Sequence, residues 1–147
     1  MSDFHNYDPG KVIFNFGLLP MPISGYAEGT FIKVRRKEDG WKSKGGADGE
    51  TTRIQNRNRQ GEIEIVLKQG SQSNAMLSVI ANLDEQLGNQ VAPASVMDMS
   101  GQDPKTAAAT LHAWLRKIPD GTFAGQDEET RTWIFDTGSL DIFIGGN

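Results

Sequence analysis

A strand, a turn and a helix follow one another between Gly61 and Gly88, and no other part of the chain limits its fold as strongly. In the first part, apolar residues alternate with charged ones: Ile63, Ile65 and Leu67 fall on one side, and Glu62, Glu64 and Lys68 on the other. A period of two is typical of a β-strand with one buried and one solvent-facing side. We therefore predict a strand over residues 61–67 whose apolar side faces the core.

The period then changes to that of a helix. Residues 70–74 are a glycine followed by hydroxyl and amide side chains, which can cap a helix start. Apolar residues recur at helical spacing after this turn, at Met76, Ile80, Leu83 and Leu87, with Leu77 and Val79 widening the stripe. Gly88 can adopt the left-handed conformation that ends a helix. The pattern predicts one α-helix at about residues 74–87, lying against a sheet.

The rest of the chain is predicted to form strands. Extended segments are expected at residues 12–16, 30–37, 51–59, 91–99, 106–117, 130–136 and 139–144. Three consecutive alanines in 106–117 favour a helix, but the alternation around Leu111, Ala113 and Leu115 favours a strand. We expect two hairpins, one joining 51–59 to 61–67 and one joining 130–136 to 139–144 through Thr137-Gly138. The prediction is a mainly β fold, a β-sandwich or small barrel with one flanking helix, in a single domain over residues 1–147.

Composition narrows the class of protein. The chain has 147 residues, enough for a hydrophobic core, and no cysteine, which excludes disulfides and thiolate metal sites. No apolar run approaches the roughly 20 residues that span a membrane. The N-terminus lacks the basic and apolar regions of a signal peptide. We expect a protein that is made and kept in the cytoplasm.

The charge is unevenly distributed. A formal net charge of -4 argues against a nucleic-acid-binding surface, since affinity for phosphates comes mostly from clustered Lys and Arg. Residues 33–44 nevertheless hold six basic and two acidic residues, and the charged residues of 120–129 are all acidic. Separate basic and acidic segments suit head-to-tail association of copies. Ordinary solvated loops are the alternative explanation.

Motifs give no catalytic or cofactor site. The histidines, His5 and His112, lack the spacing of metal ligands. Residues 45–49 are rich in glycine but are not followed by the Lys-Ser/Thr sequence and helix of a phosphate-binding loop. Glu62 and Glu64 share one strand face about 7 Å apart, which is commoner for solvated acids than for catalytic pairs. We predict that the chain is not an enzyme and holds no cofactor or metal.

The order of the segments resembles a known pattern. Its parts are the basic strand end Lys33-Val34-Arg35-Arg36, Trp41 with Gly46-Ala47-Asp48-Gly49, the strand over 61–67, the turn over 70–74 with Met76-Leu77-Ser78, Ile118-Pro119-Asp120, Trp133 and residues 140–147. From about Tyr7 to Asn147 the chain is similar to the tail tube proteins of bacteriophages with contractile tails. These are related to pyocin and type VI secretion tube proteins.

The resemblance implies a β-sandwich or small barrel with one helix, six copies in a ring, and rings that stack into the inner tube of the tail. It implies a structural virion protein that is assembled in the host cytoplasm and conducts DNA during ejection. The implied partners are further copies of the chain, the tail sheath protein, the baseplate and tail terminator proteins, and the tape measure protein inside the tube.

Candidate contact residues follow from the resemblance. The family uses a long hairpin loop and the chain termini between rings, which implies such contacts for residues 38–50 and for an N-terminal arm over residues 1–9. The candidate inter-ring residues are Trp41, Lys42, Lys44, Gly45, Gly46 and Asp48. The polar segments over residues 51–68 suit a water-filled channel, so the candidate channel-lining residues are Glu62, Glu64 and Gln55. Because DNA must slide, Arg53, Arg57 and Arg59 should either point away from the channel or pair with acids across subunits.

Two alternatives stay open. A subunit of a pyocin or secretion-type tube would share the fold without carrying DNA. A monomeric β-sandwich that binds carbohydrate or another ligand would instead need a concave aromatic patch, which Trp41, Trp114 and Trp133 could supply.

Overall fold

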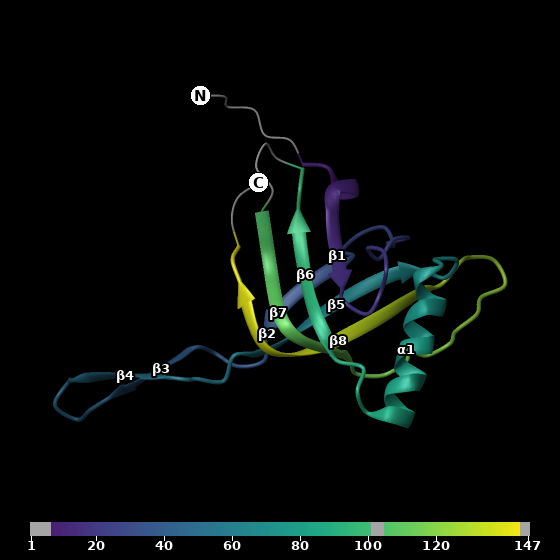
Figure 1. Cartoon of the computed structure of the whole chain (residues 1–147). Coiled ribbons are helices and arrows are strands. Elements are labelled where there is room, and N and C mark those ends of the chain that lie inside the picture. Colours follow the sequence, from purple (N-terminus) through teal and green to yellow (C-terminus); the bar gives the residue numbers. More distant parts are fainter. Residues whose placement is uncertain (1–6, 101–104, 145–147) are drawn as a thin grey trace.

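The computed structural model describes residues 7–100 and 105–144, and Figure 1 shows the arrangement of their elements. Six antiparallel strands form one sheet in the order β1-β6-β7-β8-β5-β2. The strands are β1 Val12–Phe16, β2 Ile32–Arg36, β5 Gln60–Lys68, β6 Ala92–Asp98, β7 Lys105–Leu115 and β8 Thr130–Ile142. A short 3-10 helix (Pro9–Lys11) precedes β1, and the helix α1 (Ser73–Leu87) connects β5 to β6.

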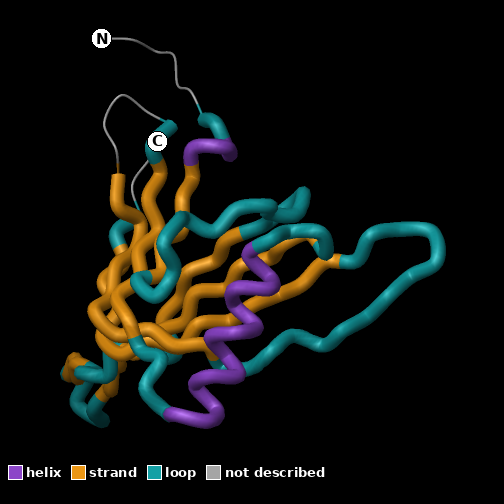
Figure 2. The backbone as a smooth tube through the Cα atoms, turned by 45° about the vertical axis from the view of Figure 1, so that its right-hand side comes forward, coloured by secondary structure: helices purple, strands orange, loops and turns teal. Residues whose placement is uncertain are grey.

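The sheet curls into a half-barrel, and α1 lies beside it (Figures 1 and 2). The ring of Phe135 on β8 lies 5.0 Å from the rings of both Phe14 and Phe16 on β1, measured between centroids. Because two other strands separate β8 from β1 in the sheet, these contacts cross the hollow of the curl. The other large side chains that are fully buried are Trp133, Ile63, Ile65, Leu67, Leu77 and Leu140. The predicted mainly β fold with one flanking helix is confirmed.

The strand and the helix between Gly61 and Gly88 are also confirmed. Ile63, Ile65 and Leu67 of β5 are fully buried, and the alternating charged residues lie on the opposite face. The helix ends before Gly88, whose φ of 68° is left-handed.

The buried side of α1 differs from the predicted stripe. Leu77, Ile80 and Ala81 are buried, whereas Val79, Leu83 and Leu87 are exposed. The apolar spacing was compatible with two overlapping stripes. The first turn selects one of them, because Trp133 Nε1 of the sheet donates a hydrogen bond of 2.9 Å to Asn74 Oδ1. The residues of the other stripe therefore face solvent.

Residues 41–55 form a separate two-stranded hairpin, which we name the arm. Its strands β3 (Trp41–Gly45) and β4 (Thr51–Gln55) pair antiparallel with each other. The turn between them is closed by a hydrogen bond of 2.7 Å from Gly46 N–H to the Glu50 carbonyl, and Gly49 has a φ of 87°, which favours glycine. The predicted pairing of residues 51–59 with 61–67 is therefore wrong.

Local hydrogen bonds explain why the chain does not turn back between β4 and β5. The side-chain oxygens of Asn56 and Asn58 accept hydrogen bonds of 3.0 and 3.1 Å from the N–H groups of Asn58 and Gln60. These bonds keep residues 56–59 out of a hairpin turn. β5 instead pairs with β2 on one side and β8 on the other.

β8 is one long strand, so the predicted final hairpin at Thr137-Gly138 is wrong. Thr137 is fully buried, and its Oγ1 accepts a hydrogen bond of 3.1 Å from Gly61 N–H. A Cβ at Gly61 would lie 2.6 Å from the Arg35 carbonyl oxygen and 2.5 Å from Leu140 Cδ2. The missing side chain at this position lets β2, β5 and β8 approach closely at the irregularity in the β5–β8 register.

The remaining predictions have mixed outcomes. The strands expected at 12–16, 30–37, 91–99 and 106–117 correspond to β1, β2, β6 and β7. In the described part of the chain, no helix has the length and apolar character needed to cross a membrane. Most of the expected N-terminal arm, residues 1–6, lies outside the described residues, as do the turn at 101–104 and residues 145–147 of the family pattern.

Candidate interaction surfaces

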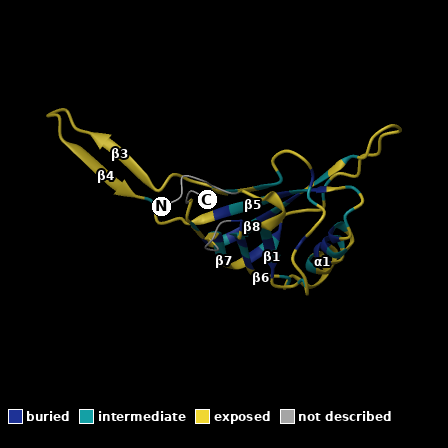
Figure 3. Ribbon diagram, turned by 90° about the horizontal axis from the view of Figure 1, so that it is seen from above, coloured by how far each residue is buried: buried dark blue, intermediate teal, exposed yellow. Residues whose placement is uncertain are grey.

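The arm projects from the sheet as an isolated ribbon (Figures 1 and 3). Each residue of β3 and β4 is exposed, and the core cluster takes no side chain from them. The arm brings together all the candidate inter-ring residues: Trp41, Lys42, Lys44 and Gly45 on β3, and Gly46 and Asp48 in the turn. An isolated two-stranded ribbon has little stability in water. The arm is therefore a surface that gains from packing on a partner.

The two faces of the arm differ in chemistry. On one face, the guanidinium carbon of Arg53 lies 3.6 Å from the centre of the Trp41 ring, a cation–π contact. On the other face, Lys42 lies directly opposite Ile54, and Lys44 lies two residues further along the same strand. The side chain of Ile54 is 47% exposed. On the first face, the cation and the aromatic ring are thus paired with each other. The second face presents an apolar side chain beside two cations.

The base of the arm is fixed by Glu38. The side-chain amides of Asn56 and Asn58 donate hydrogen bonds of 2.8 and 3.1 Å to Glu38 Oε2. These bonds lower the pKa of Glu38. Asn56 N–H also donates a bond of 2.8 Å to the Gly40 carbonyl. The arm therefore leaves the sheet in a defined direction.

A network of ion pairs covers the outer face of the sheet around β5. We name it the charged face, and it consists of Lys33, Arg35, Lys37, Glu62, Glu64, Arg116 and Asp136. Arg116 Nη2 lies 2.7 Å from Asp136 Oδ1 and 3.1 Å from Glu62 Oε2. Arg35 contacts the same Glu62 oxygen at 3.1 Å, Lys37 reaches Asp136 at 3.2 Å, and Lys33 lies 3.9 Å from Glu64. Every charged side chain of this face thus has a partner of opposite charge.

The charged face includes two of the three candidate channel-lining residues, Glu62 and Glu64. Gln55, the third, lies on the arm opposite Trp41. Arg116 and Asp136 were not among the candidate residues, although both lie in segments that were expected to form strands. Arg53 covers Trp41, and Arg59 Nη2 pairs with Asp141 Oδ1 at 2.6 Å in the same chain.

Two acids of the charged face have lowered pKa values. The hydrogen bond from Arg35 holds the pKa of Glu62 below its usual range. Burial opposes ionisation of Asp136, but hydrogen bonds from Arg116 and Lys37 hold its pKa below the usual range as well. A carboxyl group with a lower pKa in the folded state stabilises the fold above its unfolded pKa of about 4. That contribution is lost as the pH falls through the folded pKa.

We expect the free energy of unfolding to decrease as the pH is lowered from about 5 towards 2. In the Glu62→Gln/Asp136→Asn variant this decrease should be smaller by about 1 kcal/mol, because the partner cations are partly exposed and their ion pairs are weakened by solvent. Urea unfolding of the dilute, unassembled protein at several pH values measures the difference. Glu85→Gln, an exposed helix acid outside the network, is the matched control. Parallel pH curves for the wild type and the double variant would contradict the role of these pairs.

The β1 edge of the sheet is partly covered by its own chain. The Phe14 carbonyl accepts a hydrogen bond of 3.1 Å from Ile23 N–H, and the Phe16 carbonyl accepts one of 2.9 Å from Leu19 N–H. The segment after β1 therefore folds back beside that strand and occupies two of the carbonyl groups that point away from β6.

The β2 edge is free. Val66 N–H donates to the Phe31 carbonyl at 2.9 Å, and Lys37 N–H donates to the Gln60 carbonyl at 3.1 Å. Because backbone direction alternates along an antiparallel pair, the N–H and C=O groups of Ile32, Val34 and Arg36 point away from β5. Within residues 7–100 and 105–144, no hydrogen bond reaches these backbone groups.

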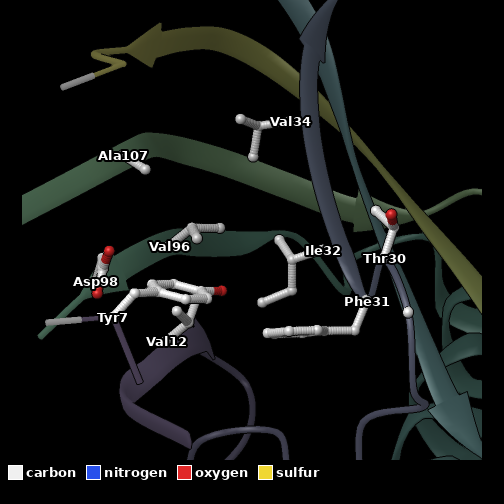
Figure 4. A pocket seen from close by; sticks show the side chains of 10 residues that line it. Tyr7, Val12, Thr30, Phe31, Ile32, Val34, Val96, Asp98 and Ala107 are labelled. Atoms are coloured by element: carbon white, nitrogen blue, oxygen red, sulfur yellow. The ribbon is translucent and has the colours of Figure 1, made fainter. Parts of the chain in front are cut away.

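An apolar cavity lies beside the free edge, between β2 and β1 (Figure 4). Its volume is about 430 Å³, and its lining is Tyr7, Val12, Gly29, Thr30, Phe31, Ile32, Val34, Val96, Asp98 and Ala107. Ile32 and Val34 extend into it from β2 (Figure 4). The cavity and the free backbone groups thus form one continuous surface at the open side of the half-barrel.

A comparison with protein families identifies the family of the chain that carries these surfaces. Residues 22–145 match the model of the bacteriophage PhiTE tail tube protein family. The chain belongs to this family. The matched range contains the arm, the charged face and the free β2 edge. As a tail tube protein, the chain is a structural protein of the virion tail that assembles with itself into a tube. The resemblance seen in the sequence and the prediction that the chain is not an enzyme are confirmed.

Two further comparisons agree with this tail tube assignment. Structural protein ORF10 of Pseudomonas phage KPP10 is 27% identical over 127 residues, which cover 85% of this chain and 71% of that protein. The fold also resembles the anti-feeding prophage cap, a tube-terminating cap solved by cryo-electron microscopy. The TM-score is 0.60 over 99% of this chain and 95% of the cap chain. At 8% sequence identity, this second likeness concerns the fold alone.

The three tryptophans of the tail tube protein do not come together in the aromatic patch that a ligand-binding module would need. Trp133 is buried on the inner face of β8, Trp114 lies on the outer face opposite Asp136, and Trp41 stands on the arm. The described residues also contain no cluster of three or more acids or histidines that could hold a metal ion. His112 is exposed, and His5 lies outside the described residues.

Proposed function

We propose that this tail tube protein forms hexameric rings, that the rings stack into the inner tube of a contractile tail, and that the tube conducts DNA during ejection. The observation that carries the proposal is the free β2 edge beside an apolar cavity. Unpaired strand edges and open apolar surfaces are liabilities in a monomer. Both are removed if a neighbouring copy adds a strand at this place.

The β2 edge would close the ring. A strand of the next copy would pair with the outward backbone groups of Ile32 and Val34, and its apolar side chains would enter the cavity. For a ring, the next copy would meet this edge through a different surface of its own, because β2 paired with β2 would stop at a two-fold dimer. Such a heterologous contact closes into a ring when the rotation between neighbouring copies is a full turn divided by a whole number.

The arm would join successive rings. Its exposed ribbon would carry Trp41, Lys42, Lys44, Gly45, Gly46 and Asp48 to the neighbouring ring, where packing would order both strands. The N-terminal residues 1–9 would make a second contact of this kind. Gln55, which lies at the base of the arm, would belong to this contact rather than to the channel wall.

The charged face would line the channel, with Glu62 and Glu64 as channel-lining residues. A wall with free Lys and Arg side chains would hold the phosphates of DNA and slow its passage. The cations of the charged face are instead paired with acids of the same chain. DNA would therefore slide along a wall whose charges are already matched.

The place of tail tube proteins in a tail supports the remaining parts of the proposal. The sheath protein would surround the tube, the baseplate and the tail terminator protein would bound its two ends, and the tape measure protein would lie inside it. The whole chain, residues 1–147, would act as one tail tube domain.

Electron microscopy of the purified protein, with light scattering on the same sample, tests the proposal. The wild type is expected to form six-fold rings or hollow tubes. In Val34→Pro the outward N–H that would pair with the next copy is lost, but no bond of the monomer is. This variant should stay folded and monomeric, whereas Val34→Thr, which keeps the N–H, should still assemble. A wild type that stays monomeric at high concentration would contradict the proposal.

A further inference from the structure

Two parts of the molecule carry charges that form no ion pair within the described residues. The ion pairs of the described residues involve the charged face and the Arg59–Asp141 pair, and none includes a residue of the arm. None includes a residue of the loop over 117–129 either, whose acids are Asp120, Asp127, Glu128 and Glu129. We name residues 117–129 the acidic loop. Lys42 and Lys44 on the arm, and Asp120 and Asp127 on this loop, therefore have no ion-pair partner among the described residues.

The acidic loop is held at its base and stands out from the molecule. Glu128 Oε1 accepts a hydrogen bond of 2.7 Å from Gly70 N–H, and Glu129 N–H donates one of 3.0 Å to Gln69 Oε1. The loop extends on the side opposite the arm, so the loop and the arm lie at opposite ends of the molecule (Figure 1). Loop and arm of the same copy cannot meet, whereas those of successive copies can.

An apolar groove separates the acidic loop from the start of α1. The cavity there measures about 380 Å³. Its apolar lining is Ile118, Pro119, Phe123 and Trp133, and its polar lining is Gln69, Asn74, Ser78 and Arg131. The ring of Phe123 is 80% exposed and lies 5.2 Å from the guanidinium carbon of Arg131. An aromatic side chain this exposed at the mouth of a groove is typical of an interaction site.

The open face of the arm is complementary to this surface. It presents Ile54 beside Lys42 and Lys44, whereas Trp41 on the other face is already covered by Arg53. An apolar side chain beside two cations matches a groove that is bordered by a loop with four acids. Charge complementarity of this kind directs the approach and fixes the register of two surfaces.

We propose that the arm of one copy docks on the acidic loop of the next copy. Ile54 packs in the groove beside Phe123, and Lys42 and Lys44 face Asp120 and Asp127. The proposal rests on the proposed function, because it takes the arm as a contact between copies, and it adds the surface that receives the arm. Since the arm and the acidic loop lie at opposite ends of the molecule, the same contact repeats from copy to copy and gives a head-to-tail assembly.

Charge reversal tests the contact. Lys42→Glu/Lys44→Glu and Asp120→Lys/Asp127→Lys each place like charges against each other, and each variant should lower the fraction of protein in sedimenting tubes by at least about tenfold. Mixing the two variants in equal amounts, or combining all four substitutions in one chain, restores opposite charges and should restore tubes. Glu85→Lys changes the net charge in the same direction as Asp120→Lys/Asp127→Lys, alters an exposed acid of α1 outside the loop, and should assemble like the wild type. Circular dichroism confirms that each variant is folded.

The outcomes separate this contact from the proposed function. Wild-type tubes together with normal tubes from Asp120→Lys/Asp127→Lys would overturn the acidic loop as the acceptor and leave the tube function standing. A four-substitution chain that stays unassembled would also overturn the pairing, since complementary charges would then not be what joins the copies. A wild type without tubes would overturn both proposals.

Discussion

Ile63→Asp is expected to unfold the subunit. Ile63 is fully buried on β5, which lies between β2 and β8 inside the sheet. A carboxylate at this position would lose its hydration and meet only apolar neighbours of the core. That penalty is comparable with the whole stability of a domain, about 5–15 kcal/mol. Circular dichroism should show loss of the β-sheet signal, and the expressed protein should be insoluble.

Thr132→Asp is the matched control for this experiment. Thr132 lies on the neighbouring strand β8, where it is exposed on the outer face of the same sheet. The same carboxylate there stays hydrated, and the change in the free energy of unfolding should be within about 0.5 kcal/mol. A soluble Ile63→Asp protein that still assembles would mean that the buried face of β5 has been misassigned.

The buried side of β5 could be predicted because it depends on a local pattern. Alternation of apolar and charged residues over Glu62 to Leu67 fixes which side of a strand is buried, whatever the neighbouring strands are. The end of α1 was equally local, since Gly88 alone provides the left-handed residue. The buried stripe of α1 was not, because the hydrogen bond between Trp133 and Asn74 that selects it joins residues 59 apart in the chain.

Strand pairing could not be predicted from the same patterns. Thr51–Gln55 is a polar segment with a turn signal on each side, and the sequence alone does not say which turn closes a hairpin. The structure uses the glycine turn at 46–50, because Asn56 and Asn58 hold the other candidate open. Thr137-Gly138 shows the same limit, since the threonine serves as a buried acceptor for Gly61 N–H, 76 positions away.

The candidate surfaces were predictable to the extent that they are continuous in sequence. The arm residues lie within one short segment, and the segregation of basic and acidic segments is visible in the chain itself. The charged face joins four separate segments, and its central contact pairs Arg116 with Glu62, 54 positions apart. The free β2 edge depends on which strand ends the sheet. The charged face and the free β2 edge could therefore be located only in the folded structure.

Removing the arm is expected to abolish tube formation while leaving the subunit folded. The structure sets the limits of the deletion. Asn56 N–H bonds to the Gly40 carbonyl at the base of the arm, so residues 41–55 can be replaced by a two-residue Asn-Gly turn without moving β2 or β5. A deletion of residues 40–49 alone would instead leave β4 without its partner. Because every residue of β3 and β4 is exposed, the free energy of unfolding should change by less than about 1 kcal/mol.

Electron microscopy and sedimentation of the armless protein measure the result. We expect single rings or monomers, since the β2 edge that would close the ring is kept and the surface that would join rings is lost. A chain that shortens only residues 46–50 to a tight turn keeps both strands with Lys42, Lys44 and Ile54, and it serves as the control for the tip. If that control assembles and the armless chain does not, the contact lies along the strands rather than at Gly46 and Asp48. Normal tubes from the armless chain would show that ring stacking uses another surface.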